Sequence, residues 1–251
     1  MGAVHGCSLK YVALGGIYGL SAVTSPFSSP SLEENEIDSH PHPARIDFAT
    51  ALLLYSSFIN FLIAVLFHFQ VGTDLLGKTT DGKIPLWSYI IFAPFHIPTI
   101  IYTKIHTDYG ISHGVPVASE VADGWYIGGR YGDQLNLTWG GILDLTAEFP
   151  ESCKSRNYLN IKCWDGTPPS PADIDRAATF GAMARKEGNV MVHCAHGRGR
   201  STCCMVACLV KAGVYKNVEE AFKGCKPHRP VIKLNGRMKR ALEEWENKYV
   251  K

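Results

Sequence analysis

The sequence predicts an α/β protein: one domain with a mainly parallel sheet flanked by helices, preceded by two transmembrane helices and a third, weaker candidate span. Two observations lead to this prediction. Long apolar runs occupy residues 48–69 and 84–105, whereas the chain from about residue 115 alternates short apolar strands with helical segments. Such alternation is typical of a mostly parallel sheet covered by helices on its faces.

The N-terminal segment and linker cover residues 1–47. An apolar, glycine-rich stretch at 11–23 follows Lys10, and it fits either a signal-type segment or a weak third span. Residues 25–45 mix Pro, Ser, Glu and His with few apolar side chains. This composition indicates a flexible linker.

Residues 48–69 form the first predicted transmembrane helix. The segment FATALLLYSSFINFLIAVLFHF has 22 residues and no Lys, Arg, Asp or Glu. That length suffices to cross a hydrocarbon core of about 30 Å. The alternative is a buried core helix, but such helices rarely run this long without a charged face.

A loop at 70–83 leads to the second predicted transmembrane helix, 84–105. The single charged residue of this segment is Lys104, and its prolines would kink a helix, which membrane spans tolerate. A buried core helix is again the alternative. The charges that flank the two spans are too evenly distributed to set their orientation.

The α/β domain is predicted over residues 115–251. An Asp-Gly pair at 123–124 between two apolar runs predicts a β-hairpin. Short apolar runs predict buried strands at 141–145, 158–161 and 190–192. Capping residues and glycine stops predict helices at 171–186, 201–211, from 217 onward and at 235–249.

Composition excludes several classes of function. With 25 basic and 23 acidic residues the net charge is +2, which gives no reason to expect a nucleic-acid partner. The eight cysteines form no CxxC pair, which argues against a zinc site and a disulfide framework. We expect these thiols to be reduced, which favours a cytosol-like compartment for the part of the chain that carries Cys194. We expect no metal or other cofactor.

The segment VMVHCAHGRGRST, residues 190–202, carries the candidate chemistry. It joins a predicted strand to a predicted helix, and ligands of open α/β sheets bind at this end of the strands. Gly197 and Gly199 permit a loop whose backbone N–H groups turn inward. Together with the positive end of the following helix, these amides predict a site for a phosphate-sized anion.

The same surroundings favour ionisation of Cys194. A thiol near a helix N-terminus and an arginine loses its proton more readily than a thiol in water. Arg200 lies six residues further on and offers a planar fork to two oxygens. The pattern predicts a thiolate that attacks phosphorus while Arg200 and the loop amides hold the oxygens.

The motif Cys-x5-Arg, with a preceding His and a following Ser, resembles the signature of the protein tyrosine phosphatase superfamily. The resemblance covers about residues 117–249 and is closest to the dual-specificity branch. Four blocks carry it in order: VADGWYIGGR, CWDGTPP, HCAHGRGRS and HRPVIKLN. It implies a single dual-specificity-phosphatase-like domain that needs no metal.

The resemblance also implies roles. Cys194 would form the phosphocysteine intermediate, Arg200 would bind the phosphoryl oxygens, His193 would brace the loop, and Ser201 would ease departure of the sulfur. The intervening loop positions would bind phosphate: Ala195, His196, Gly197, Arg198 and Gly199.

Asp165 is the predicted general acid. It follows a predicted strand in the Gly/Pro-rich loop KCWDGTPPS, so it can lean over the same end of the sheet and protonate the leaving oxygen. This matches the acid loop of the family. Asp173 and Asp175 are the rivals, but both fall inside the predicted capped helix, where capping and solvation explain them.

The leading functional hypothesis is an integral membrane phosphatase that dephosphorylates tyrosine, serine or threonine in proteins, with its catalytic domain in the cytosol or another reducing compartment. The first alternative is a phosphatase of phosphoinositides or phosphatidylglycerophosphate, favoured by the extra basic residues His196 and Arg198. The second is a catalytically weak, phosphate-binding membrane adaptor, which the presence of Cys194, Arg200 and Asp165 disfavours.

Overall fold

The computed structural model describes residues 6–24, 47–132, 135–152, 155 and 157–250. Its sheet has five strands in the order β1-β2-β5-β3-β4. Their bounds are β1 Ala118–Ala122, β2 Trp125–Gly128, β3 Trp139–Thr146, β4 Tyr158–Cys163 and β5 Asn189–His193. β1 pairs antiparallel with β2 around the predicted turn, where Gly124 has φ +68°, and the other strands pair in parallel. The predicted α/β domain is confirmed, with a mixed sheet.

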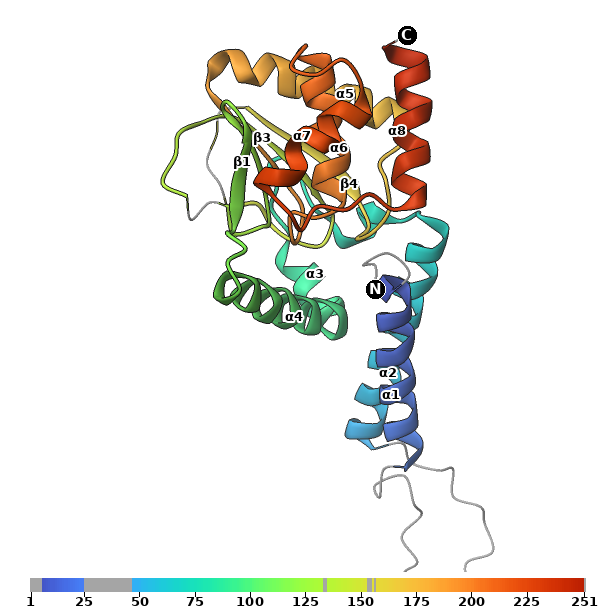
Figure 1. Ribbon diagram of the computed structural model, residues 1–251. Coiled ribbons are helices and arrows are strands. Elements are labelled where there is room, and N and C mark those ends of the chain that lie inside the picture. The colour runs from blue at the N-terminus through green and yellow to red at the C-terminus, as the bar shows by residue number, and fades with distance from the viewer. Residues whose placement is uncertain (1–5, 25–46, 133–134, 153–154, 156, 251) are drawn as a thin grey trace, which may run out of the picture.

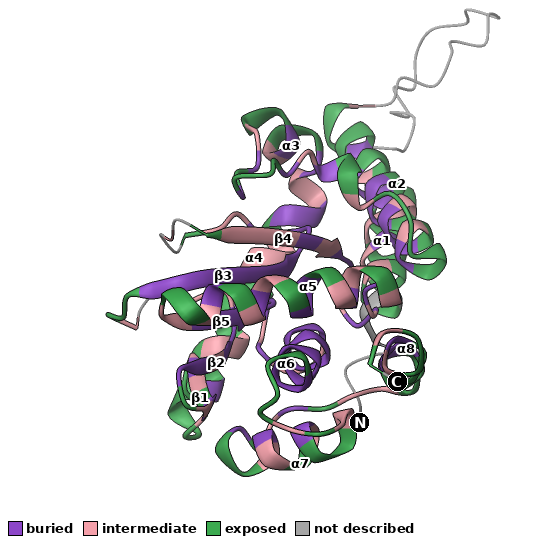
Figure 2. Cartoon of the chain, turned by 90° about the horizontal axis from the view of Figure 1, so that it is seen from above, coloured by how far each residue is buried: buried purple, intermediate pink, exposed green. Residues whose placement is uncertain are grey.

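Helices cover this sheet. They are α5 Pro171–Ala184, followed by a 3-10 turn Arg185–Glu187, and α6 Arg200–Lys211, α7 Val218–His228 and α8 Gly236–Tyr249. Side chains of the Ncap residues Ser170, Asn217 and Asn235 accept hydrogen bonds from the first turns of α5, α7 and α8. Figure 2 shows α6 enclosed by the sheet, α5, α7 and α8, and its residues 200–210 are all buried. The helix that carries Arg200 therefore lies in the core of the domain.

Two N-terminal helices, α1 Gly6–Thr24 and α2 Phe48–Phe69, lie side by side below the catalytic domain (Figure 1). They approach closely at Gly15 and Gly19, where a Cβ atom would lie 3.1 Å from the Phe61 ring and from Ser57 Oγ. Ser57 Oγ also donates a hydrogen bond of 2.8 Å to the Gly15 carbonyl. Small residues four apart allow this kind of contact between membrane helices.

α2 occupies the residues of the first predicted span. Within the described ranges it is the one helix long and apolar enough to cross a membrane, by a criterion of length and composition that the core helix of a soluble protein can also meet. The weaker candidate at 11–23 lies within α1, which does not meet that criterion.

The second predicted span, 84–105, differs from the expectation of one helix. The structure divides it into α3 Leu86–Ile91 and α4 Ala93–Ser112, which meet at Phe92. Pro94 lies in the first turn of α4, where its missing N–H costs no hydrogen bond but a helix continuing from α3 would lose one. α4 runs across the axis of the α1–α2 pair, beneath the catalytic domain (Figure 1).

The segment predicted as a loop, 70–83, packs tightly on the catalytic domain. It contains a 3-10 turn, Thr73–Leu76, and Leu76 is fully buried. Trp164 donates a hydrogen bond of 2.8 Å from Nε1 to the carbonyl of Val71. Trp164 also shares an apolar cluster with Phe67 of α2 and Phe95 of α4. The N-terminal helices and the catalytic domain are thus joined through a common core.

Candidate active site

The loop from Cys194 to Gly199 leaves the end of β5 and enters α6. The Cys194 N–H donates to the Gly128 carbonyl at 3.3 Å, and a bridge between Gly129 and His196 holds the loop against β2. Gly197 has φ +64°, and a Cβ atom there would lie 2.5 Å from the backbone of Gly128. Only glycine fits this position without displacing the strand.

Cys194 is buried, and its Sγ lies 3.4 Å from Ser201 Oγ. Burial raises the pKa of the thiol, but the charge of Arg200 and hydrogen bonds from the Ser201 hydroxyl and N–H outweigh that effect, so the pKa is lowered overall. Burial raises the pKa of Cys203 and Cys208 to about 12. Cys194 is therefore distinguished from its buried neighbours by its surroundings and not by its exposure.

The Arg200 guanidinium is fully buried and held from behind by Glu148. Its Nη2 donates to Glu148 Oε1 at 2.7 Å and its Nη1 to Oε2 at 3.1 Å, with further bonds from Nη1 to the carbonyls of Leu145 and Cys163. The buried Nε has no hydrogen-bond partner. An oxygen of an anion would satisfy such a donor.

Asp165 reaches the same place from the loop after β4. Its Oδ1 lies 3.2 Å from Arg200 Nη2, and its side chain is 32% exposed. The loop is tied down by a hydrogen bond of 3.0 Å from Asn235 Nδ2 to the Gly166 carbonyl. The structure thus brings together Cys194, Arg200, Ser201 and Asp165, which the sequence singled out.

The rival carboxylates lie elsewhere. Asp173 accepts a hydrogen bond from Ser170 at the start of α5 and pairs with Arg176 at 3.2 Å. Asp175 pairs with Lys211 at 3.0 Å and accepts from Trp245 Nε1 at 3.2 Å. Both have the capping and pairing contacts expected of structural residues.

His193 was expected to brace the loop, but its described contacts are with acidic side chains. Its Nε2 lies 2.6 Å from Glu151 Oε2 and 3.8 Å from Asp144 Oδ1. Burial lowers the pKa of the ring, yet the two carboxylates raise it to about 9 overall. His193 is therefore an imidazolium near neutral pH, and any support it gives the loop passes through Glu151.

A buried lysine completes this group of charges. Lys78, from the 70–83 segment, pairs with Asp144 and donates to the Thr146 carbonyl at 3.0 Å. We call Lys78, Asp144, Glu151 and His193 the His193 cluster. Its acids and imidazole could in principle ligate a metal ion. The Lys78 ammonium and the imidazolium already balance both carboxylates, however, so the donor set does not fit a cation.

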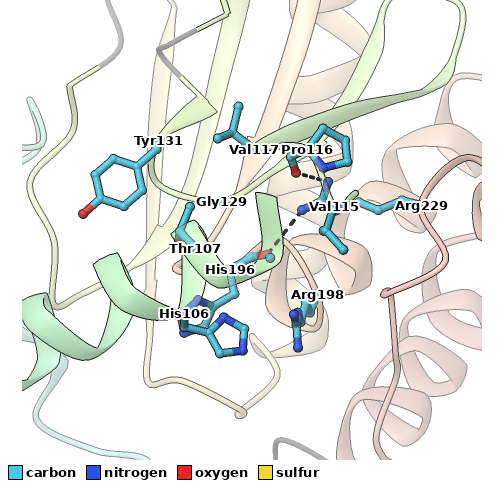
Figure 3. Close-up of a pocket in the computed structure, with 11 residues that line it drawn as sticks. His106, Thr107, Val115, Pro116, Val117, Gly129, Tyr131, His196, Arg198 and Arg229 are labelled. Atoms are coloured by element: carbon cyan, nitrogen blue, oxygen red, sulfur yellow. Dashed lines mark hydrogen bonds between the residues drawn. The ribbon is translucent and has the colours of Figure 1, made fainter. Parts of the chain in front are cut away.

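The loop positions 195–199 are held by a residue that sequence reasoning passed over. Arg229, within the HRPVIKLN block, donates from Nε to the Gly197 carbonyl at 2.8 Å and from Nη2 to the His196 carbonyl at 3.3 Å. Its Nη1 binds the Pro116 carbonyl at 3.0 Å. Figure 3 shows Arg229 bridging these segments.

His196 turns toward α4. Its ring centroid lies 4.4 Å from that of His106, and both line a cavity of about 20 Å³ with Arg198 (Figure 3). Burial lowers the pKa of His196 to about 3. The ring is neutral, so the basic capacity expected of His196 is absent, which removes one of the two sequence arguments for a polyanionic substrate.

Comparison with known proteins agrees with this geometry. Residues 134–248 match the family model described as "Dual specificity phosphatase, catalytic domain". Residues 134–248 are thus similar to the catalytic domain of dual-specificity phosphatases. The chain is accordingly a phosphatase, a hydrolase of phosphoric monoesters.

Solved structures similar to this domain include human DUSP28, with 19% identity over 54% of this chain and 97% of that one, at a TM-score of 0.46. A mouse putative dual specificity phosphatase complexed with zinc tungstate has 20% identity over 53% and 87%, at 0.45. PTPMT1 in complex with PI(5)P has 18% identity over 53% and 96%, at 0.44. A search of curated proteins found no match.

Proposed function

We propose that the protein is a membrane-anchored phosphatase that hydrolyses phosphomonoesters through a phosphocysteine intermediate. The observation that carries this proposal is the lowered pKa of Cys194 beside Arg200 and Ser201, with Asp165 within 3.2 Å of the same guanidinium. A thiolate, an anion-binding arginine and a partly exposed carboxyl group meet at one point.

The chemistry has two steps. The Cys194 thiolate attacks phosphorus, the bond from phosphorus to the ester oxygen breaks, and Asp165 gives its proton to that oxygen. Water then attacks the phosphocysteine, Asp165 takes a proton from the water, and the bond between phosphorus and sulfur breaks. Inorganic phosphate leaves while the Ser201 hydroxyl, 3.4 Å away, stabilises the departing thiolate.

Anchoring in a membrane is supported by the N-terminal helices. α2 has the length and composition of a span, and α1 packs on it through Gly15 and Gly19. Large apolar side chains on both helices face outward, among them Leu20, Val23 and Phe58. Many large exposed apolar side chains on one pair of helices favour contact with a membrane or another protein. The catalytic domain, proposed over 115–251, would lie on the reducing side, since its mechanism needs a free thiolate.

Two alternatives from the sequence remain relevant to this site. A phosphoprotein substrate uses the same loop and acid as a lipid phosphate, so the catalytic groups themselves do not separate them. An adaptor without turnover has less support, because a thiol with a lowered pKa beside a carboxyl group serves hydrolysis and adds nothing to binding alone.

The test uses the purified full chain in detergent micelles with a small aryl phosphate. Cys194→Ser should abolish release of inorganic phosphate while calorimetry still detects phosphate binding, because Arg200 and the loop amides remain. A metal chelator should not change the rate of the unsubstituted chain. Appreciable turnover by Cys194→Ser would show that the nucleophile lies elsewhere, and absence of turnover by the unsubstituted chain would favour the adaptor.

A further inference from the structure

A cavity of about 400 Å³ opens directly beside the catalytic residues. One side is formed by Asp165, Ala195 and His196, and the other by side chains of α1 and α4. Its volume lies within the range of roughly 300–1,000 Å³ that is typical of small-molecule sites. The cavity therefore joins the phosphate-binding loop to the two N-terminal elements beneath the domain.

The position of Asp165 indicates what enters this cavity. The general acid must contact the leaving oxygen, so the carbon skeleton attached to that oxygen extends from Asp165. Asp165 lines this cavity, which we call the α1–α4 cavity. The leaving group of the substrate would therefore lie in it.

The far wall of the cavity is apolar in its greater part, although hydroxyl groups such as those of Tyr11 and Thr99, which bond to each other, also lie there. Ala13, Leu14 and Ile17 of α1 and Pro98 of α4 line it, with Phe149 beside Glu148 on the catalytic side. A phosphopeptide would bring several peptide groups against these side chains, and burying them without partners is unfavourable. A hydrocarbon chain gains free energy in the same place.

The outer surfaces of the same two helices also carry large apolar side chains. Ile17 lines the cavity and is 60% exposed, and Leu20 one turn further on is 66% exposed. On α4, Ile97, Ile101 and Ile105 are exposed in the same way. A molecule held among acyl chains would therefore meet exposed apolar side chains on both helices that line the cavity.

One cation lies at the edge of the cavity. Lys10 lines it, and its Nζ is 4.0 Å from the centre of the Tyr102 ring. An ammonium group next to an apolar site suits an anionic head group attached to a hydrocarbon chain.

We infer that the substrate is a lipid phosphomonoester whose hydrocarbon chain lies in the α1–α4 cavity while its phosphate occupies the loop from Cys194 to Arg200. This inference rests on the proposed function and names the substrate class of the same site. It favours the lipid alternative over the phosphoprotein substrate that led the sequence hypotheses.

The experiment measures kcat/KM for the full chain in lipid nanodiscs with butyl, hexyl and octyl phosphate and with a small aryl phosphate. Burial of a methylene group changes binding by up to roughly fourfold. The rate constant for the alkyl series should therefore rise with chain length, by at least about tenfold from butyl to octyl.

A matched pair of variants assigns this rise to the cavity. Ala13→Trp fills the cavity, whereas Val12→Trp places the same ring on the neighbouring residue, which is 43% exposed and does not line it. Ala13→Trp should lower the octyl-to-aryl ratio of kcat/KM by about tenfold, because the lost contact is that of the chain. Val12→Trp should keep the ratio and the aryl rate of the unsubstituted protein.

Each other outcome has a definite meaning. A flat alkyl series, equal effects of the two tryptophans, or faster turnover of a phosphoserine peptide than of octyl phosphate would overturn the lipid inference. Turnover of the aryl phosphate would in each case leave the proposed function intact. Loss of turnover on every substrate, the aryl phosphate included, would contradict the proposed function and the inference with it.

Discussion

Two clusters of polar side chains meet at the end of β5. His193 belongs to one of them and the next residue, Cys194, to the other. His193 belongs to the His193 cluster, in which the side chains of Lys78, Asp144 and Glu151 are at most 5% exposed and the charges balance. Cys194 belongs to a site where Asp165 is 32% exposed and Arg200 Nε has no partner. Successive side chains of a strand point to opposite faces, which separates the two.

The comparison shows that burial and a shifted pKa do not by themselves identify a catalytic group. Despite its burial, the pKa of His193 is raised to about 9 by Glu151 and Asp144, and no side chain of this charge-balanced cluster is more than 5% exposed. The pKa of Cys194 is lowered by an arginine that retains an unused donor. We infer that the first group stabilises the fold and the second performs the reaction.

Removing a charge from the His193 cluster should give the largest loss in the free energy of unfolding. Lys78→Met leaves two buried carboxylates facing one imidazolium, and removal of one partner from a buried ion pair costs about 3–5 kcal/mol. Chemical denaturation of the purified chain in micelles measures this loss. The matched control is Lys83→Met, because Lys83 pairs with Asp81 in the same segment with both side chains exposed. Equal losses for the two variants would mean that the His193 cluster is not a stabilising element.

The pH dependence of stability should follow His193. Its pKa is about 9 in the folded protein against an ordinary 6.5, so the stabilisation is fully present below pH 6.5 and is lost as the pH rises through 9. The change is on the order of 3 kcal/mol. Denaturation curves measured from pH 6 to 10 test it, and His193→Gln should remove this slope. A stability that rises over the same range would contradict the assignment.

Substitutions in the site around Cys194 should change the rate of hydrolysis and leave the stability of the fold unchanged. Asp165→Asn should lower kcat roughly 10²-fold for alkyl phosphates and much less for aryl phosphates with acidic phenols, which leave without a proton. A series of aryl and alkyl esters measures this difference. Asp173→Asn, in the first turn of α5, serves as the control and should leave the whole series unchanged. Equal losses along the series for Asp165→Asn would transfer the acid role to another residue.

The elements that depend on residues close together in the chain could be predicted from the sequence. The Asp-Gly turn at 123–124, the cap at Ser170 and the strand-loop-helix around Cys194 each depend on neighbouring residues, and the structure has the corresponding hairpin, helix and loop. The candidate site residues Cys194, Arg200 and Asp165 lie together because parallel strands end at the same edge of the sheet.

Ion pairs between side chains far apart in the chain could not be predicted from local sequence. Glu148 holds Arg200 from 52 residues away, and Lys78 pairs with Asp144 across 66 residues. Lys78 and Lys83 both lie in the polar segment 70–83, and nothing in the sequence indicates that the first is buried and the second exposed. The division of 84–105 at Phe92 was also missed, because hydropathy alone reads α3 and α4 as one apolar run.

The most direct test of the account is the ionisation of Cys194. Alkylation by iodoacetamide, followed for each cysteine by mass spectrometry from pH 5 to 10 in the full chain, reports the fraction of thiolate. We expect the midpoint for Cys194 to lie below the ordinary value of 9.0 and to rise in Ser201→Ala, while Cys203 and Cys208 stay unreactive. A midpoint at or above 9.0 for Cys194, or equal reactivity of the three thiols, would contradict the central claim that this loop holds a thiolate nucleophile.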